Sequence, residues 1–327
     1  MIYHCLSPLG VGLFSMDQNP DFTDQAALDA VLNKAVELDQ LQKRGDQEEG
    51  LLYLPNKLSP FTGWSQETHR NGQVSDLIHY LNGKQDGLSA EWYENGQIYK
   101  SISYRENRRN GLFEEWHTNG LIASRCTYCN DKKDRQHESW YENGNKQERY
   151  TFKDGKKEGL CEDWHQNGQP ALKYTISNGN VDGLSESWYE GGQRWKTINY
   201  KDGQYHGLYE SWHANGNRRS RYNCKNDHID GIFEDWHPNG NRWKKACYKD
   251  GQYHGLCDEW SLEGTRRFRL NYRKGVKHGL CEAWHSSGEL SWKCTYREGR
   301  EHGPWERWDE DGNHSLEHWQ DGNPVDA

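Results

Sequence analysis

Apolar and polar residues alternate in short runs along most of this chain, and the pattern restarts every 24 residues. In a strand, every second side chain lies on the same face, so a stretch such as 159–164 (Gly-Leu-Cys-Glu-Asp-Trp) predicts a strand with one face ending in tryptophan. That tryptophan recurs without interruption at Trp92, Trp116, Trp140, Trp164, Trp188, Trp212, Trp236, Trp260, Trp284 and Trp308. A fixed period of this length predicts stacked structural repeats.

Each repeat is predicted to be one β-hairpin followed by a turn into the next hairpin. Asn-Gly pairs such as Asn95-Gly96 and Asn239-Gly240 separate two alternating runs, which favours a type I′ turn with positive φ at both central residues. Counting a first repeat in which Thr68 replaces the tryptophan, about eleven repeats fill residues 59–327. The predicted fold is all-β, an elongated single-layer antiparallel hairpin array.

The turn predicts which residues face each other across each hairpin. If Gln166 faces Gln169, the same rule pairs opposite charges in seven of ten hairpins, each worth roughly 0.2 to 1 kcal/mol. These pairs are Glu114–Arg125, Glu138–Arg149, Glu162–Lys173, Glu210–Arg221, Glu234–Lys245, Asp258–Arg269 and Glu282–Lys293. The other hairpins pair Ala90 with Ser101, Glu186 with Thr197 and Glu306 with Glu317. The rule also predicts that Trp188 faces Trp195 and that Trp236 faces Trp243.

Residues 1–58 carry a different pattern and form a separate N-terminal segment. Residues 1 to 20 show no periodicity, and we expect them to be loosely ordered. Apolar residues at helical spacing predict one amphipathic α-helix over about 24–44, with Thr23 as N-cap and Gly45 as its stop. We expect this helix to cover the first edge of the array, and Leu51–Leu54 to form a lead-in strand.

Composition and charge narrow the functional classes. Hydrophobic residues make up only 32% of the chain, while 16 Trp and 19 Tyr are unusually many, so aromatic rings must supply much of the buried area. The net charge is −9, and outside residues 1–58 the array is nearly neutral. A protein that binds nucleic acid normally has a basic excess, so we expect no nucleic-acid partner.

The repeat resembles the MORN repeat in its bacterial variant form. The resemblance rests on stretches such as Gly207-Leu208-Tyr209-Glu210-Ser211-Trp212-His213-Ala214-Asn215-Gly216, preceded by Tyr200-Lys201-Asp202-Gly203, and it covers about 60–327. It implies a scaffold or protein-binding array. Many bacterial relatives are labelled as antitoxin components of toxin–antitoxin systems, which would make the partner a toxin, and other MORN proteins are linked to membranes or lipids. The repeat at Arg135-Gln136 lacks the opening Gly-Leu, and Asn107, Asp131 and Asp227 replace glycine in three turns between repeats.

Cysteine and histidine suggest metal binding, but their spacing argues against it. The nine cysteines scatter over different repeat positions, which indicates free thiols in a reducing compartment. Cys126 and Cys129 have zinc-knuckle spacing, yet residues three apart in a strand point to opposite faces. The apolar stretch Leu6–Phe14 lacks a basic flank, and no run reaches membrane-spanning length. We therefore expect no metal, no cofactor and a cytoplasmic location.

One column of residues remains as the candidate binding surface. Directly after most tryptophans stands a tyrosine or a histidine, namely Tyr93, His117, Tyr141, His165, Tyr189, His213, His237 and His285. A repeated aromatic stripe is typical of a protein-binding face. The unbroken period leaves no inserted loop for an active site, so the sequence predicts a non-enzymatic protein-binding scaffold. The family resemblance adds the antitoxin-like interaction protein as a specific form of it. The alternative is a structural or membrane-associated assembly component.

Overall fold

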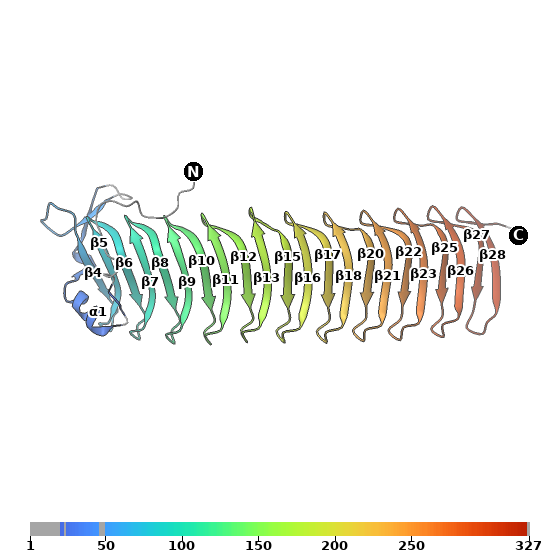
Figure 1. The fold of residues 1–327 in the computed structure, drawn as a ribbon, viewed down its shortest axis with the longest axis horizontal. Helices are drawn as coiled ribbons and strands as arrows, with labels where there is room; N and C mark the ends of the chain where they lie inside the picture. Colours follow the sequence, from blue (N-terminus) through green and yellow to red (C-terminus); the bar gives the residue numbers. More distant parts are fainter. Residues whose placement is uncertain (1–19, 23, 46–49, 326–327) are drawn as a thin grey trace. The chain divides into compact units, whose positions relative to one another are not determined.

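The computed structural model describes residues 20–22, 24–45 and 50–325. We expected residues 1 to 20 to be loosely ordered, and all of them except Pro20 lie outside the described part. Thr23, the expected N-cap, also lies outside it. The chain divides between Gly168 and Gln169 into two compact units, and the elements of each follow in chain order in Figure 1. The boundary expected near residue 58 remains a prediction.

The described part of the N-terminal segment contains one short helix. The side chain of Asp24 accepts a hydrogen bond from the Ala26 N–H (3.1 Å) and caps α1 (Gln25–Leu32). The chain continues through β1 (Val36–Glu37), the 3₁₀ turn η2 (Leu38–Gln40) and β2 (Gln42–Arg44). β2 pairs with β3 (Leu51–Tyr53), which is the expected lead-in strand, in a separate two-stranded sheet.

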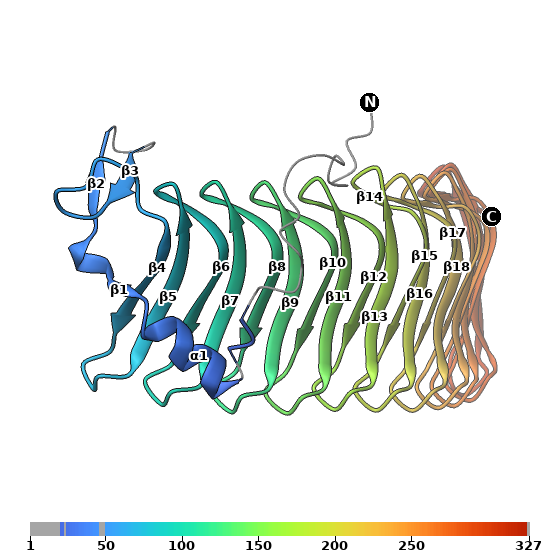
Figure 2. The ribbon, with the colours of Figure 1, turned by 60° about the vertical axis from the view of Figure 1, so that its left-hand side comes forward.

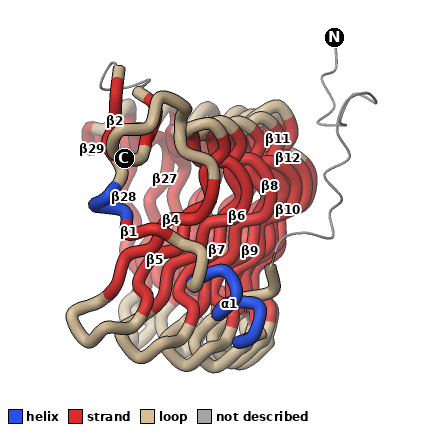
Figure 3. Tube along the Cα trace, turned by 90° about the vertical axis from the view of Figure 1, so that its left-hand side faces the viewer, coloured by secondary structure: helices blue, strands red, loops and turns tan. Residues whose placement is uncertain are grey.

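The helix expected over about 24–44 therefore ends at Leu32. Beyond it, β1 pairs in parallel with β4 (Gly63–Thr68), the first strand of the array. A helix continued through Val36 would leave the backbone hydrogen-bonding groups of β4 without these partners, and such an edge promotes aggregation. The free edge is thus covered by β1, whereas α1 covers a face of the sheet (Figures 2 and 3).

Beneath the helix that face is apolar. Leu28 packs with Leu77, Ala90 and Trp92 in a buried cluster. Around it lie Phe22, Val31, Leu32, Ala35, Trp64, Val74 and Ile98. The Phe22 ring meets the rings of Trp64 and Trp92 edge-on, at 5.8 and 5.7 Å between centroids. Burying such side chains contributes roughly 1.5 to 3 kcal/mol each, so this cluster fastens the N-terminal segment to the first two repeats.

In both units, successive long strands pair antiparallel as a meander, which confirms the predicted all-β hairpin array. The first unit contains β4, then β5 (Val74–Leu81), β6 (Lys84–Trp92), β7 (Ile98–Arg105), β8 (Arg108–Trp116), β9 (Ile122–Cys129), β10 (Lys132–Trp140), β11 (Lys146–Lys153) and β12 (Lys156–Trp164). The second unit contains β13 (Pro170–Ser177), β14 (Asn180–Val181), β15 (Gly183–Trp188), β16 (Arg194–Lys201), β17 (Gln204–Trp212), β18 (Arg218–Lys225), β19 (His228–Ile229), β20 (Gly231–Trp236), β21 (Arg242–Lys249), β22 (Gln252–Trp260), β23 (Arg266–Arg273), β24 (Val276–Lys277), β25 (Gly279–Trp284), β26 (Leu290–Arg297), β27 (Arg300–Trp308), β28 (His314–Gln320) and β29 (Asn323–Val325).

The loop inside each hairpin is not the predicted type I′ turn. Between β6 and β7, the Gly96 N–H donates to the Tyr93 carbonyl (2.9 Å) and the Tyr93 N–H donates to the Gln97 carbonyl (2.8 Å). Gly96 has φ 84°, while Asn95 is not among the residues with positive φ. These features define a three-residue loop, in which a type I turn is followed by a left-handed glycine. The asparagine instead accepts a hydrogen bond from the Gln97 N–H (3.0 Å).

Type I′ geometry occurs in the turns between repeats. Asp202 and Gly203 have φ 51° and 84°, with Lys201 and Gln204 paired on either side. Asn107, Asp131 and Asp227, which replace the glycine, adopt φ 65°, 66° and 64°. Their side chains accept hydrogen bonds from the N–H groups of Gln85 (2.7 Å), Arg109 (3.0 Å) and Tyr205 (2.8 Å) in the preceding turn. These three turns therefore keep their regular form.

The predicted hairpin register is confirmed for the charge pairs that lie within one unit. Glu114 faces Arg125, Glu138 faces Arg149, and the same holds for Glu210–Arg221, Glu234–Lys245, Asp258–Arg269 and Glu282–Lys293. Ala90 faces Ser101 and Glu186 faces Thr197, also as predicted. Glu162 and Lys173 belong to different units.

The register fails next to the loop and in the last hairpin. Trp188 faces Arg194 and Trp236 faces Arg242, so the predicted tryptophan pairs are wrong. A β-bulge leaves one extra residue in the second strand, and Trp195 and Trp243 are those extra residues. Glu306 faces Leu316 instead of Glu317, because the pairing of β27 with β28 runs without a bulge.

Candidate functional site: an aromatic column and the contacts around it

The Tyr/His column lies where the first strand of each hairpin enters its loop. Apart from His165, each side chain of the column reaches one repeat along the chain and donates a hydrogen bond to the backbone carbonyl of the next tryptophan. The donor–acceptor distances are 2.8 Å for Tyr93–Trp116, 2.9 Å for His117–Trp140, 2.9 Å for Tyr141–Trp164, 2.9 Å for Tyr189–Trp212, 3.0 Å for His213–Trp236, 3.3 Å for His237–Trp260 and 2.8 Å for His285–Trp308. His165 holds the same position and is half-buried.

The column has a member that sequence reasoning missed. His69 in the first repeat donates from Nε2 to the Trp92 carbonyl (2.9 Å). It stands 24 residues before Tyr93, so the period alone would have found it. In every histidine that makes this bond the Nε2 atom must carry the proton, because a carbonyl only accepts. The hydroxyl or Nε2–H group at the end of each of these rings is thus bonded to the next repeat, while the ring itself remains half-exposed.

Aromatic bulge residues extend this column at the surface. Tyr99 lies 5.0 Å from Tyr93, measured between ring centroids, and Trp195 lies 6.1 Å from Tyr189. Trp243 lies 6.2 Å from His237. These outer rings are 36%, 41% and 48% exposed, respectively. Sequence reasoning did not predict this exposure for the two tryptophans, because it placed Trp195 and Trp243 in cross-strand pairs with Trp188 and Trp236.

The charged residues form a row in which the sign alternates from strand to strand. In the first unit the row runs Glu114, Arg125, Glu138, Arg149 and Glu162. In the second it runs Glu210, Arg221, Glu234, Lys245, Asp258, Arg269, Glu282, Lys293 and Glu306. Each inner residue therefore faces an opposite charge on both sides, both within its hairpin and in the adjacent repeat.

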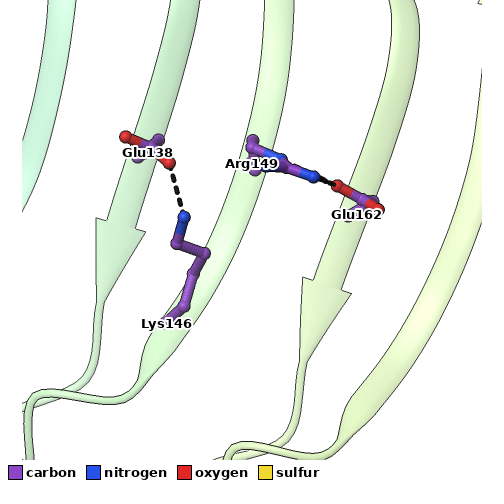
Figure 4. Close-up of polar contacts among 4 residues, drawn as sticks. All are labelled: Glu138, Lys146, Arg149 and Glu162. Carbon is purple, nitrogen blue, oxygen red and sulfur yellow. Dashed lines mark hydrogen bonds and ion pairs between the residues drawn. The ribbon is translucent and has the colours of Figure 1, made fainter.

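Side-chain contacts within this row do not always follow the hairpin. Glu138 faces Arg149, yet Lys146 contacts Glu138 (2.5 Å between Nζ and Oε1), and the Arg149 guanidinium contacts Glu162 in the next repeat (Figure 4). Basic residues beside the loop also lie over tryptophan rings of the next repeat. The Cζ atoms of Arg194, Arg218 and Arg242 lie 5.6, 5.4 and 5.6 Å from the ring centroids of Trp212, Trp236 and Trp260.

The opposite face carries a buried row of small, aromatic and thiol-bearing side chains. Cys161, Cys257 and Cys281 share one repeat position and are 0%, 2% and 0% exposed. Burial raises the pKa of the Cys257 thiol to about 11 and that of Cys294 to about 12, so these groups stay protonated and unreactive. Cys129, by contrast, is disulfide-bonded, so the expectation of free thiols is wrong for this residue.

His137 is the one histidine of that buried row among the described residues. Its Nδ1 lies 3.5 Å from the Lys133 Nζ, and its ring stacks 6.4 Å from Tyr150. Burial, together with the positive charges of Lys133 and Lys157, lowers the pKa of His137 to about 4. The ring is therefore neutral at pH 7 and serves as a packing residue.

Acidic side chains near the turns between repeats form hydrogen bonds with a neighbouring turn. Asp86 and Asp182 accept hydrogen bonds from the N–H groups of Glu106 and Asp202, each over 3.2 Å, one turn further along. The Asp131 carboxylate accepts bonds from the backbone and side chain of Arg109, which lower its pKa. Across residues 20–22, 24–45 and 50–325, no group of three or more His, Cys, Asp or Glu side chains is placed to hold a metal ion.

A hollow of about 200 Å³ lies on the charged face of the second unit, lined by Leu208, Arg221, Tyr222, Asn223, Ile232 and Glu234. Ligand pockets usually enclose about 300 to 1,000 Å³. This hollow is therefore smaller than a usual ligand pocket.

The profile of the MORN repeat variant matches residues 85–106, 136–154, 181–202 and 229–250. These segments are similar to that family, whose repeats mediate interactions with proteins or membrane lipids. No curated protein matches the chain. No helix in the described part of the chain is both long and apolar enough to cross a membrane.

Proposed function

We propose that this protein is a non-enzymatic, cytoplasmic scaffold that binds a protein partner along the Tyr/His column and its bulge aromatics. The observation that carries the proposal is the recurrence of half-exposed rings at one repeat position, with the rings of Tyr99, Trp195 and Trp243 lying against three of them at a tilt. Aromatic side chains offer large contact area at low entropic cost, and they are enriched in protein interfaces. In its narrower form, suggested by the family resemblance alone, the partner is a toxin and the protein its antitoxin.

Co-purification of the full chain from its native host tests the scaffold. We expect a protein partner at a constant ratio to the chain, retained under mild conditions. The Trp195→Ala/Trp243→Ala double variant should release part of that partner while keeping its circular dichroism spectrum. A chain from which no protein partner can be recovered would contradict the proposal.

A second candidate, assembly on a membrane or between copies, has its own supporting observation. Four aliphatic side chains of the second unit share one repeat position and are about half-exposed: Leu184 48%, Ile232 51%, Leu256 45% and Leu280 48%. Periodic exposed apolar residues can mark an association surface. Liposome flotation and light scattering separate the two candidates, because a monomer that ignores liposomes would exclude assembly.

A further inference from the structure

Two exposed tryptophans of the second unit suggest the conformation of the partner, an inference that rests on the proposed function. Trp195 and Trp243 occupy the same bulge position two repeats apart. In the repeat between them Arg219 takes this position and is also exposed. The order along the surface is therefore indole, guanidinium, indole.

These three side chains have unused binding capacity. Among the described residues, neither indole N–H has a hydrogen-bond acceptor, and Arg219 forms no close ion pair, although its charge acts on the buried carboxylate of Asp235. The Lys196 Nζ lies 4.4 Å from the centroid of the Trp195 ring and adds positive charge to the same region. The surface thus offers two flat apolar rings, two donors for carbonyl groups and an excess of positive charge in the middle.

The spacing selects the backbone conformation of a ligand that meets all three. Adjacent repeats are two strand spacings apart, about 9.6 Å. A polyproline II helix presents every third residue on one side and advances about 9.3 Å over three residues. One heptad of an α-helix advances about 10.5 Å, and in an extended strand the third residue points away. Polyproline II fits the spacing best, and its carbonyls, which form no internal hydrogen bonds, are free to accept from the indoles.

We propose that Trp195, Arg219 and Trp243 form a docking surface for a proline-rich segment of a protein partner in the polyproline II conformation. Prolines pack on the two indoles, as they do in aromatic-lined grooves generally, and an acidic residue midway pairs with Arg219. The recognised pattern is Pro-x-x-(Asp/Glu)-x-x-Pro. An acidic residue at that site complements the positive charge of Arg219 and Lys196.

Binding of synthetic peptides to the full chain tests this assignment. The probe is an acetylated nonapeptide, Pro-Pro-Ala-Glu-Pro-Ala-Pro-Pro-Ala, measured by calorimetry against a version with lysine in place of glutamate. We expect the acidic peptide to bind at least tenfold more tightly than the basic one. Arg219→Glu should reverse this preference, and Trp195→Ala or Trp243→Ala should each weaken binding at least fivefold with an unchanged circular dichroism spectrum.

The chain supplies a matched control. Leu316 is 52% exposed and lies in the last hairpin, away from the bulge position of Trp195 and Trp243, so Leu316→Ala should leave peptide binding unchanged. Failure of the native chain to bind the acidic peptide, or equal binding by the folded Trp195→Ala/Trp243→Ala variant, overturns the docking proposal. If the natural partner co-purifies undiminished with that double variant, the scaffold stands and the polyproline assignment alone fails. If no partner co-purifies with either protein, the proposed function fails as well.

Discussion

Tyr141 donates its phenolic hydroxyl to the backbone carbonyl of Trp164, one repeat along, over 2.9 Å. Where histidine takes this position, as at His117, Nε2 makes the same bond. A tyrosine hydroxyl and a histidine Nε2–H are both donors at the far end of a flat ring, which explains why these two residue types alternate in one column. The column therefore links each hairpin to the next.

Removing one of these donors should destabilise the array without changing its fold. We expect Tyr141→Phe to lower the free energy of unfolding by about 1 kcal/mol, because the Trp164 carbonyl loses its partner in a half-buried position. Urea denaturation followed by tryptophan fluorescence measures the change. Tyr99→Phe is the control, since the Tyr99 hydroxyl bonds to no described residue, and its effect should stay within about 0.5 kcal/mol. Equal effects of the two variants would contradict the linking role.

Arg149 should couple energetically to Glu162 rather than to Glu138, although Glu138 faces it across the hairpin. Double-mutant cycles with alanine at each pair measure the two coupling energies. We expect about 0.5 kcal/mol for Arg149–Glu162, because both residues are partly exposed, and a value near zero for Arg149–Glu138. A larger coupling across the hairpin would show that side chains follow the backbone register after all.

Arg135 should be a weak point of the first unit. It lies in the first strand of its hairpin, at the position that Gly111 and Gly159 occupy in the neighbouring repeats, and its φ is 63°. Left-handed backbone costs a residue with a Cβ atom roughly 1 to 2 kcal/mol, partly offset by the greater flexibility of glycine in the unfolded chain. We expect Arg135→Gly to stabilise the protein by about 0.5 to 1 kcal/mol in urea denaturation. The reciprocal control, Gly159→Ala, should destabilise it, although a Cβ atom there would meet its nearest neighbour only at 4.0 Å.

His137 should make the protein sensitive to mild acid. Its pKa is about 4 in the folded chain and near 6.5 when unfolded, so below pH 6.5 the unfolded chain takes up a proton that the folded chain does not. Stability is therefore lost as the pH falls from 6.5 to 4, by roughly 3 kcal/mol. His137→Phe, chosen because Phe113 holds the same position one repeat earlier, should lack this component. Urea denaturation of both proteins at pH 7 and pH 4 checks it, and parallel pH dependences would argue against a buried neutral histidine.

The period and the alternation of residues were enough to predict the hairpins and the pairing of Glu114 with Arg125 and its counterparts, because one buried face fixes strand register. The same reasoning placed the type I′ turn in the wrong loop. Asn95 and its equivalents look like turn residues, but asparagine there bonds within its loop and, at Asn119, to the Glu142 carbonyl of the next loop (2.7 Å). The turn type therefore depends on contacts with a neighbouring repeat, and a prediction made from the two strands of one hairpin does not include them.

The candidate site was predictable only in part for a related reason. The positions of the Tyr/His column follow from the period, but its bonds to tryptophan carbonyls depend on stacking between hairpins. The bulge that exposes Trp195 adds one residue to a single strand, and hydrophobic alternation gives no sign of it. The helix was predicted too long because residues 36–44 have helical spacing, while the edge of β4 offers Val36 and Glu37 a strand partner.

The alternating row of charges constrains how such a protein can change its length. Loss or gain of one strand would bring like charges face to face, for example Arg125 beside Arg149 if the strand carrying Glu138 were removed. Loss or gain of a whole hairpin removes one acid and one base together and leaves every remaining neighbour opposite in sign. Gene duplication or deletion in steps of 24 codons therefore preserves the alternation of charge, so we expect this sheet to lengthen or shorten during evolution by whole hairpins.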